Sequence, residues 1–269
     1  MKKIFLLLIL NITLISISNA QFDDRFYFPV KEWDNMDELN YEELTFNIDT
    51  ISLNAILLKP ESKPKVTILF FHGAGGNVSK YTFMTKPLVE AGYQVFMLDA
   101  RGYGKSTGIP THTNVAKDAQ FVFESIIKRK DIKKTKLIIY GASLGTQIAT
   151  KLAKDNQTKV SGLILDGTIS SFTDMALLSA PAEQKAMIAQ YVTSPYSAKE
   201  DIKEITDMPK LFIHSEGDKS VPFSQGETVF KNALEPKEFW NYKGNHIDAI
   251  TISPEILVQK VSNLVNKEN

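Results

Sequence analysis

Cysteine is absent from the 269 residues of the sequence. This absence excludes disulfides, cysteine nucleophiles, thiolate metal sites and an anchor built on a lipid-modified cysteine. The chain also lacks an excess of either charge, because 31 Lys and Arg residues balance 31 Asp and Glu residues. No overall field favours nucleic acid or an acidic substrate, and we expect small or neutral partners.

One nearly continuous apolar stretch occurs at the N-terminus, over residues 4–17. Lys2 and Lys3 precede it, and Ser18-Asn19-Ala20 follows it with small residues at a potential cleavage site. This three-part pattern is typical of a bacterial secretory signal peptide that is cut after Ala20. An uncleaved anchor is the alternative, although the run is short for a bilayer span of about 20 residues. We expect residues 1–20 to be removed, leaving a periplasmic or secreted protein without a stable membrane span.

The remaining chain is long enough for one large domain with a buried core. Residues 21–42 mix aromatic and acidic side chains without a period and predict an N-terminal extension that lies over the core. Residues 43–269 form the expected domain, which begins with a β-hairpin over 43–48 and 51–58. Strands and helices then alternate: strands 66–71, 94–98, 137–142, 160–165, 210–214 and 237–242, and helices 79–91, 113–128, 224–233 and 254–265. This alternation predicts an α/β fold with a mostly parallel, doubly wound sheet.

Residues 170–195 interrupt the alternation with apolar and helix-forming residues and no strand. An insertion after the carboxyl end of a strand lies beside the crevice where such folds bind ligands. We therefore expect a short helical cap, although periodicity leaves open a helix packed elsewhere on the sheet.

The sequence Gly141-Ala142-Ser143-Leu144-Gly145 follows an apolar strand and precedes a helix-forming run. A serine on such a sharp turn is held in a strained backbone conformation with its Oγ exposed above the sheet. The pattern predicts Ser143 as a nucleophile.

A serine nucleophile needs a base, which is usually a histidine oriented by a carboxylate. In hydrolases with this turn, the acid and then the histidine follow the serine along the chain. Of the four histidines, His72 and His112 precede Ser143, and His214 lies within an apolar strand. His246, in a loop after the last strand, remains as the candidate base.

Three carboxylates are candidates for the acid. Asp218 and Glu216 lie in the loop after the strand 210–214, and Asp166 ends the preceding strand. The order along the chain permits all three.

The oxyanion of an acyl-transfer intermediate needs backbone N–H donors. Leu144 follows the nucleophile at a helix N-terminus and should provide one. The loop 72–76 should provide the other, and Ala74 is the expected donor. A plain glycine turn at Gly75-Gly76 is the alternative, and His72 is expected to shape this loop.

Several of these segments together resemble the α/β-hydrolase-fold serine hydrolases, in the branch of lysophospholipase-like, monoacylglycerol-lipase-like and serine-aminopeptidase-like proteins. The matching stretches are His72-Gly73-Ala74-Gly75-Gly76, residues 99–106, Gly141-Ala142-Ser143-Leu144-Gly145, Gly217-Asp218 with Val221-Pro222, and Asn245-His246. The resemblance implies Asp218 as the acid beside Ser143 and His246, and it implies no metal or organic cofactor. Thr146 and Ser215 depart from the pattern, since glycine is common at both positions.

The function implied is hydrolysis of a small-molecule acyl ester through an acyl-enzyme. A thioesterase and an aminopeptidase of the same fold are alternatives, and an aminopeptidase needs an acidic group near the crevice. Asp166, Asp174 and Glu183 are the carboxylates that could supply it. A catalytically silent binding protein of the cell envelope is an alternative from another class.

Overall fold

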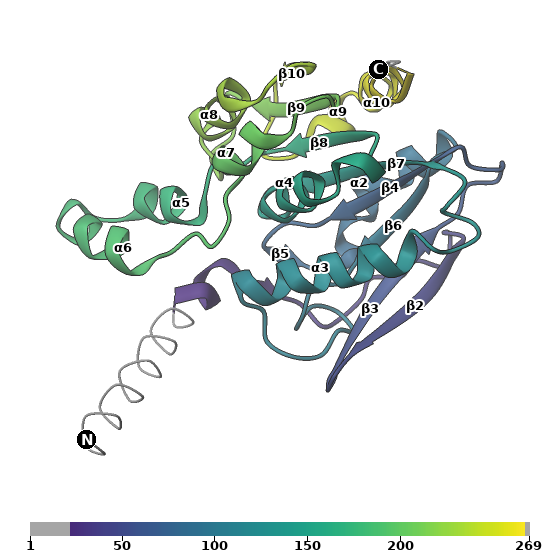
Figure 1. Ribbon diagram of the computed structural model, residues 1–269, viewed down its shortest axis with the longest axis horizontal. Coiled ribbons are helices and arrows are strands. Elements are labelled where there is room, and N and C mark those ends of the chain that lie inside the picture. The colour runs from purple at the N-terminus through teal and green to yellow at the C-terminus, as the bar shows by residue number, and fades with distance from the viewer. Residues whose placement is uncertain (1–21, 267–269) are drawn as a thin grey trace.

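A computed structural model describes residues 22–266 of the chain, so the expected signal peptide lies outside the described residues. The main sheet has eight strands in the order β10-β9-β8-β7-β4-β6-β3-β2. Helices cover both of its faces, which gives three layers (Figure 1). The sheet is parallel from β10 to β6 and antiparallel at the β3 and β2 edge. This is the mostly parallel α/β architecture that the sequence predicts.

The strands of the main sheet are β2 (Tyr41–Ile48), β3 (Ile51–Leu58), β4 (Val66–Phe71), β6 (Gln94–Leu98), β7 (Lys136–Ala142), β8 (Gly162–Asp166), β9 (Lys210–Ser215) and β10 (Lys237–Tyr242). The larger helices of the body are α2 (Thr82–Glu90), α3 (His112–Ile126), α4 (Gly145–Asp155), α8 (Phe223–Asn232) and α10 (Pro254–Asn266). Short helices α7 (Ala198–Asp201) and α9 (Ala249–Ile252) connect them, as do the 3-10 helices η3 (Gln157–Lys159) and η5 (Ile202–Glu204).

The central strands consist of apolar runs because both of their faces are buried. Successive side chains point to opposite faces of a strand. In β4, Ile68 and Phe70 accordingly join the core under α2 and α10, whereas Leu69 and Phe71 join the core under α3, α4 and α8. Residues in β7 alternate in the same way, so the two cores lie on opposite faces of one sheet.

One predicted helix, over 79–91, is divided in the structure. Residues Val78–Tyr81 form the 3-10 helix η2, and α2 begins only at Thr82. The side chain of Asn77 accepts hydrogen bonds from the N–H and Oγ of Ser79 at 3.0 and 2.6 Å, which fixes a tight first turn. The sequence pattern does not distinguish this turn from an α-helix.

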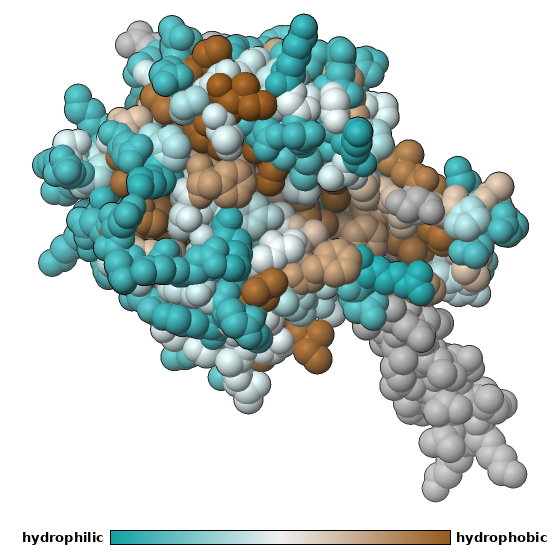
Figure 2. Space-filling view, turned by 180° about the vertical axis from the view of Figure 1, so that it is seen from behind, coloured by the Kyte–Doolittle hydropathy of each residue, from teal (hydrophilic) through white to brown (hydrophobic). Residues whose placement is uncertain are grey.

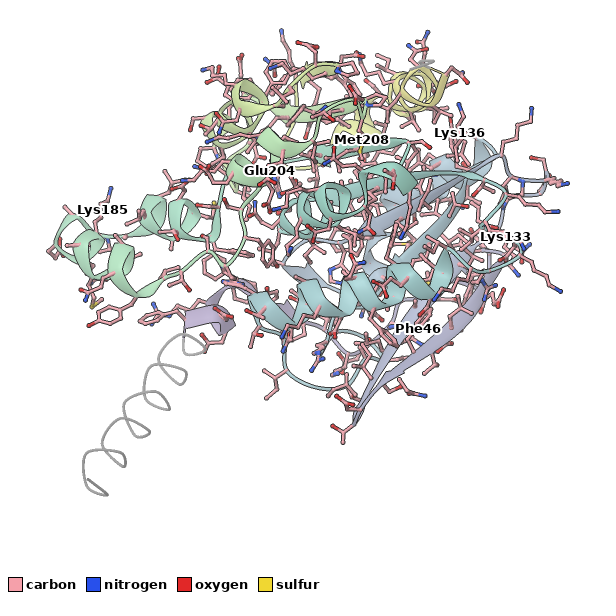
Figure 3. All side chains as sticks on the ribbon, viewed as in Figure 1. Phe46, Lys133, Lys136, Lys185, Glu204 and Met208 are labelled. Atoms are coloured by element: carbon pink, nitrogen blue, oxygen red, sulfur yellow. The ribbon has the colours of Figure 1, made fainter. Side chains whose placement is uncertain are left out.

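The segment between β8 and α7 extends away from the body (Figure 1). It contains α5 (Phe172–Ser179), the 3-10 helix η4 (Ala182–Gln184) and α6 (Lys185–Tyr191). We call residues 170–195 the cap. Lys185 lies at its outer end, far from the sheet edge that carries Phe46 (Figure 3).

The N-terminal extension contains the 3-10 helix η1 (Asp24–Phe26) and the strand β1 (Phe28–Pro29), and it contacts the loop that follows β4. There β1 pairs in parallel with the two-residue strand β5 (Gly75–Gly76). Sequence periodicity gave no sign of this small sheet, because each of its strands has only two residues.

Candidate active site

Ser143 lies between β7 and α4, at the carboxyl end of the central strand, with a backbone φ of 53°. This left-handed conformation is uncommon for a residue other than glycine. The Ser143 N–H donates to the carbonyl of Asp166 at 2.7 Å, and the Ser143 carbonyl accepts from the Thr146 N–H at 2.9 Å. The surrounding backbone therefore holds the strained turn in place.

Glycine is required on both sides of this turn. A Cβ on Gly145 would lie 2.1 Å from the Phe71 carbonyl oxygen, well inside contact distance. A Cβ on Gly141 would lie 2.7 Å from Cβ of Ala149. The two glycines let α4 start close against β4 and β7, which fixes where Ser143 stands.

His246 and Asp218 come from the two loops after β10 and β9, and they are in direct contact. Nδ1 of His246 lies 2.5 Å from Oδ2 of Asp218. The other carboxylate oxygen of Asp218 accepts the N–H groups of Ser220 and Val221, each at 2.8 Å. This contact leaves Nε2 as the His246 nitrogen that is free to exchange a proton with a reacting group.

The carboxyl of Asp218 is buried yet stays ionised. Burial alone would raise its pKa, but the hydrogen bonds from His246 and from the Val221 and Ser220 N–H groups outweigh burial and lower the pKa below its usual value. An ionised Asp218 fixes the orientation of the His246 ring and stabilises its protonated form.

The two loops are also tied to each other through Ser215. Its hydroxyl donates to the Gly244 carbonyl at 2.6 Å and accepts the Gly217 and Gly244 N–H groups at 3.0 and 3.2 Å. Glycine, which is common at this position, has no hydroxyl to make these bonds. Ser215 thus fixes the spacing between the Asp218 loop and the His246 loop.

The loop 72–76 and Leu144 flank Ser143. The carbonyl of Ala74 accepts the Phe28 N–H at 2.8 Å and the Tyr103 hydroxyl at 2.5 Å, which sets the plane of the peptide. The N–H groups of Ala74 and Leu144 donate none of the hydrogen bonds found among residues 22–266. Two backbone donors beside Ser143 are therefore free to bind an oxyanion.

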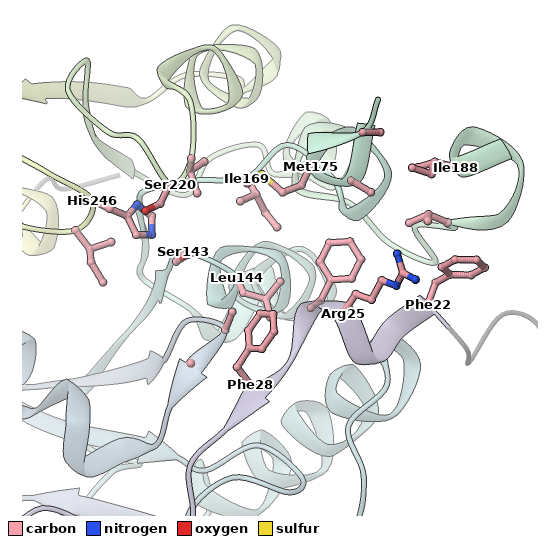
Figure 4. Close-up of a pocket in the computed structure, with 18 of the residues that line it drawn as sticks. Phe22, Arg25, Phe28, Ser143, Leu144, Ile169, Met175, Ile188, Ser220 and His246 are labelled. Atoms are coloured by element: carbon pink, nitrogen blue, oxygen red, sulfur yellow. The ribbon is translucent and has the colours of Figure 1, made fainter. Parts of the chain in front are cut away.

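A pocket of about 930 Å³ opens over these groups, and Ser143, Leu144, Ala74 and His246 all line it. Figure 4 shows Ser143 and His246 at one end of this pocket and Phe22 at the other. The cap forms much of the wall with Met175, Ala176, Ala180, Pro181, Gln184, Met187, Ile188 and Val192. The surface where the cap meets the body is correspondingly hydrophobic (Figure 2).

Comparison with known proteins is consistent with this geometry. The family model described as serine aminopeptidase, S33 matches residues 62–195. Protein bem46 of Schizosaccharomyces pombe is 32% identical over 198 residues, which are 71% of this chain and 65% of that protein. Lysophosphatidylserine lipase ABHD12 of Danio rerio is 28% identical over 195 residues, 65% of this chain and 49% of that protein. The structure of the Pyrococcus furiosus esterase Pf2001 covers 89% of this chain with 98% of its own, at a TM-score of 0.71 and 17% identity.

The chain has the α/β-hydrolase fold and is similar in sequence to α/β hydrolases. The chain spans 65% of the length of bem46 and 49% of the length of ABHD12. The likeness to the esterase, at 17% identity, shows the fold alone.

The other two candidate acids, Glu216 and Asp166, have hydrogen-bond partners other than His246 among the described residues. Glu216 accepts from the Asn241 side-chain amide at 2.8 Å on the surface. Asp166 is fully buried and accepts the Tyr140 hydroxyl at 2.8 Å, and burial raises the pKa of Asp166 to about 7. Among the described hydrogen bonds, neither carboxylate contacts the imidazole. Asp218 is the carboxylate that the fold brings to His246.

The remaining three histidines, His72, His112 and His214, are buried. Nδ1 of His72 lies 2.8 Å from the Gly73 carbonyl, within the loop 72–76. His214 is buried beside Asp218, with Nε2 at 3.0 Å from the Val221 carbonyl, and burial lowers the pKa of His214. His112 is buried beneath the N-terminal extension, and burial lowers its pKa to about 3.

The sequence analysis did not predict two features of the site. Gly167, at φ 61°, lets the chain pass so close to the His246 ring that a Cβ would lie 2.6 Å from Cε1. The N-terminal extension also lines the pocket, through Phe22, Arg25, Phe26 and Phe28. The many aromatic residues of this segment indicate that it packs against the body, but they do not show where it packs.

Residues 22–266 contain no group of three or more metal-ligating side chains that could hold a metal ion. Within the same residues, no helix has the length and apolar character to cross a bilayer.

Proposed function

We propose that this α/β hydrolase cleaves carboxylic esters through an acyl-enzyme, with Ser143 as nucleophile, His246 as base and Asp218 as acid. The observation that carries the proposal is the meeting of four loops at one pocket. These loops supply a serine on a strained turn, a histidine held by an ionised carboxylate, and two unused backbone donors. These are the groups that acyl transfer uses, and their presence at one pocket supports the proposal.

The reaction follows from these positions. Ser143 Oγ attacks the ester carbonyl carbon while its proton moves to Nε2 of His246. The carbonyl oxygen becomes an oxyanion, which accepts the N–H groups of Ala74 and Leu144. The C–O bond to the alcohol then breaks, and the alcohol leaves with the proton from His246. Water repeats the sequence on the acyl-enzyme, releasing the carboxylic acid and restoring Ser143.

The pocket favours an ester over an aminoacyl substrate. An aminopeptidase needs a carboxylate that binds the substrate amine, and the residues that line the described pocket include neither Asp nor Glu. Asp174 contacts Lys199 at 2.6 Å and Ser170 at 2.6 Å, Asp166 is fully buried, and Glu183 is not part of the pocket wall. The mostly apolar wall is suited to an acyl chain, and one relative is named as a lysophosphatidylserine lipase.

Turnover of p-nitrophenyl esters and thioesters of several acyl lengths, compared with aminoacyl p-nitroanilides, tests this proposal. We expect ester hydrolysis that Ser143→Ala reduces by about ten-thousand-fold or more while the circular dichroism spectrum stays unchanged. Preference for the anilides would favour the aminopeptidase. Equal turnover by the Ser143→Ala variant would contradict the nucleophile, and no turnover of any substrate would favour a binding protein.

We also propose that the mature hydrolase is periplasmic or secreted and begins after Ala20. The basic, apolar and small-residue parts of residues 1–20 support this. N-terminal sequencing of the protein from a periplasmic extract should start at Gln21. A membrane-bound protein that retains residues 1–20 would instead favour an anchor.

A further inference from the structure

Arg25 is the feature of the pocket that the proposed mechanism does not use. It lines the wall at the end opposite His246, next to Phe22 (Figure 4). Its guanidinium carbon lies 5.4 Å from the centre of the Phe22 ring, an arrangement in which the ring supports the cation. Apart from the imidazole of His246, the guanidinium of Arg25 is the only basic side chain among the residues of the described wall, which include neither Asp nor Glu.

The segment that carries Arg25 is anchored to the body on both sides. Asp23 accepts the His112 backbone N–H at 2.8 Å, and the Tyr27 hydroxyl lies 2.9 Å from Nδ1 of His112. The Phe26 ring packs edge-on against His112 at 5.1 Å and against Phe172 at 5.5 Å. Because Phe172 begins the first cap helix, these contacts hold the backbone at Arg25 beside the cap, and the Arg25 side chain is exposed.

The charge of Arg25 has no partner among residues 22–266. The described ion pairs do not include Arg25. The two acids nearest in sequence, Asp23 and Asp24, form no described ion pair with Arg25. Asp23 accepts the His112 N–H, and Asp24 is exposed and is not part of the pocket wall. A guanidinium in this setting is free to bind a carboxylate or a phosphate through two parallel N–H donors.

We infer that Arg25 binds an anionic group on the ester substrate and that the hydrolase prefers amphiphilic esters carrying such a group at a distance from the scissile carbonyl. The apolar wall between Ser143 and Arg25 holds the hydrocarbon part of the substrate. This inference rests on the proposed ester hydrolysis, of which it names the substrate class. The anion is a carboxylate on the acyl chain or a phosphate on the alcohol, and both present the same chemistry to a guanidinium.

Matched substrates distinguish the two sources of the anion. The mono-p-nitrophenyl ester of a long dicarboxylic acid is compared with its neutral methyl ester, and 1-acylglycerol 3-phosphate is compared with 1-acylglycerol. In Arg25→Gln, we expect the ratio of kcat/KM for the anionic member to that for the neutral member of one pair to fall about tenfold, because charge-assisted hydrogen bonds are lost. Arg25→Lys should retain part of the ratio.

Lys185→Gln is the matched control, because it removes the same charge from an exposed cap residue that does not line the pocket. We expect this variant to leave both members of each pair unchanged. A ratio unaffected by Arg25→Gln in both pairs would overturn the inference, as would an equal change of the ratio in Lys185→Gln.

Binding separates this inference from the proposed reaction. Calorimetry of decyl phosphate and of decanol with the unmodified protein and with Arg25→Gln requires no catalysis. We expect tighter binding of the phosphate by the unmodified protein and about tenfold weaker binding of it by the variant. Equal binding of the two amphiphiles would refute the role of Arg25 even in an active esterase. Selective binding without ester turnover would refute only the reaction.

Discussion

At the scale of single residues, the account depends on which groups carry charge. Asp218 is buried and ionised, whereas Asp166 is buried and has a pKa raised to about 7 by burial. The difference arises from hydrogen bonding. His246 and two backbone N–H groups donate to the carboxylate of Asp218, but among residues 22–266 only the Tyr140 hydroxyl donates to the carboxylate of Asp166. The sequence left both residues open as the acid, because position at a strand end does not reveal the number of donors.

Asp218→Asn should reduce kcat of ester hydrolysis by about ten-thousand-fold with little change of the fold. The amide keeps the shape of the side chain but no longer stabilises the protonated imidazole. Steady-state kinetics with a p-nitrophenyl ester measures the loss, and Glu216→Gln is the control that should retain activity. If Glu216→Gln lost most of its activity and Asp218→Asn lost none, Glu216 would be the catalytic acid and Asp218 would not.

Asp166 should make the protein less stable as the pH rises. Its folded pKa lies above the unfolded value, so its contribution to stability is complete below pH ~4 and is lost as the pH rises through about 7. The free energy of unfolding, measured in urea at pH 5 and pH 8, should therefore fall more for the unmodified protein than for Asp166→Asn. The same decrease in both proteins would show that Asp166 does not titrate in this range.

At the scale of elements, the sequence predicted the strand, turn and helix around Ser143 because local glycines and apolar runs determine them. It also indicated His246 and the loop 72–76 as candidates, and both line the pocket together with Ser143. It gave no indication of the pairing of β1 with β5, or of Gly167 beside His246. These features depend on the docking of segments distant in sequence, about which periodicity says nothing.

Gly145→Ala should destabilise the protein by about 2–3 kcal/mol, because the new Cβ would collide with the backbone of β4 rather than with a movable side chain. Gly75→Ala is the matched control, since a Cβ there meets nothing within 4 Å. Urea unfolding compares the two variants. Equal stability of both would contradict the close packing of α4 against β4.

Tyr103→Phe should reduce kcat about tenfold and leave KM nearly unchanged. The variant removes the hydroxyl that donates to the Ala74 carbonyl, so the peptide that carries one oxyanion donor is less firmly oriented. Kinetics with a neutral ester tests this, and unfolding in urea checks that the buried ring still packs. An unchanged kcat would show that β1 alone positions the loop.

At the scale of the whole molecule, the pocket belongs to three parts of the chain. The loops at the carboxyl edge of the sheet provide Ser143 and His246. The cap provides an apolar wall, and the N-terminal extension lines the far end with Phe22 and Arg25. The sequence predicted the first two parts from motifs and from the interrupted alternation. The third could not be predicted, because only the folded chain brings residues 22–28 beside the cap.

Labelling with a fluorophosphonate tests the central claim most directly. The probe reacts with an activated serine, forming an Oγ–P bond and releasing fluoride. After digestion, mass spectrometry should find one adduct on the peptide that contains Ser143, and the label should be absent from Ser143→Ala and strongly reduced in His246→Ala. A folded protein that remains unlabelled, or that is labelled equally well without His246, would contradict the assignment of Ser143 as an activated nucleophile.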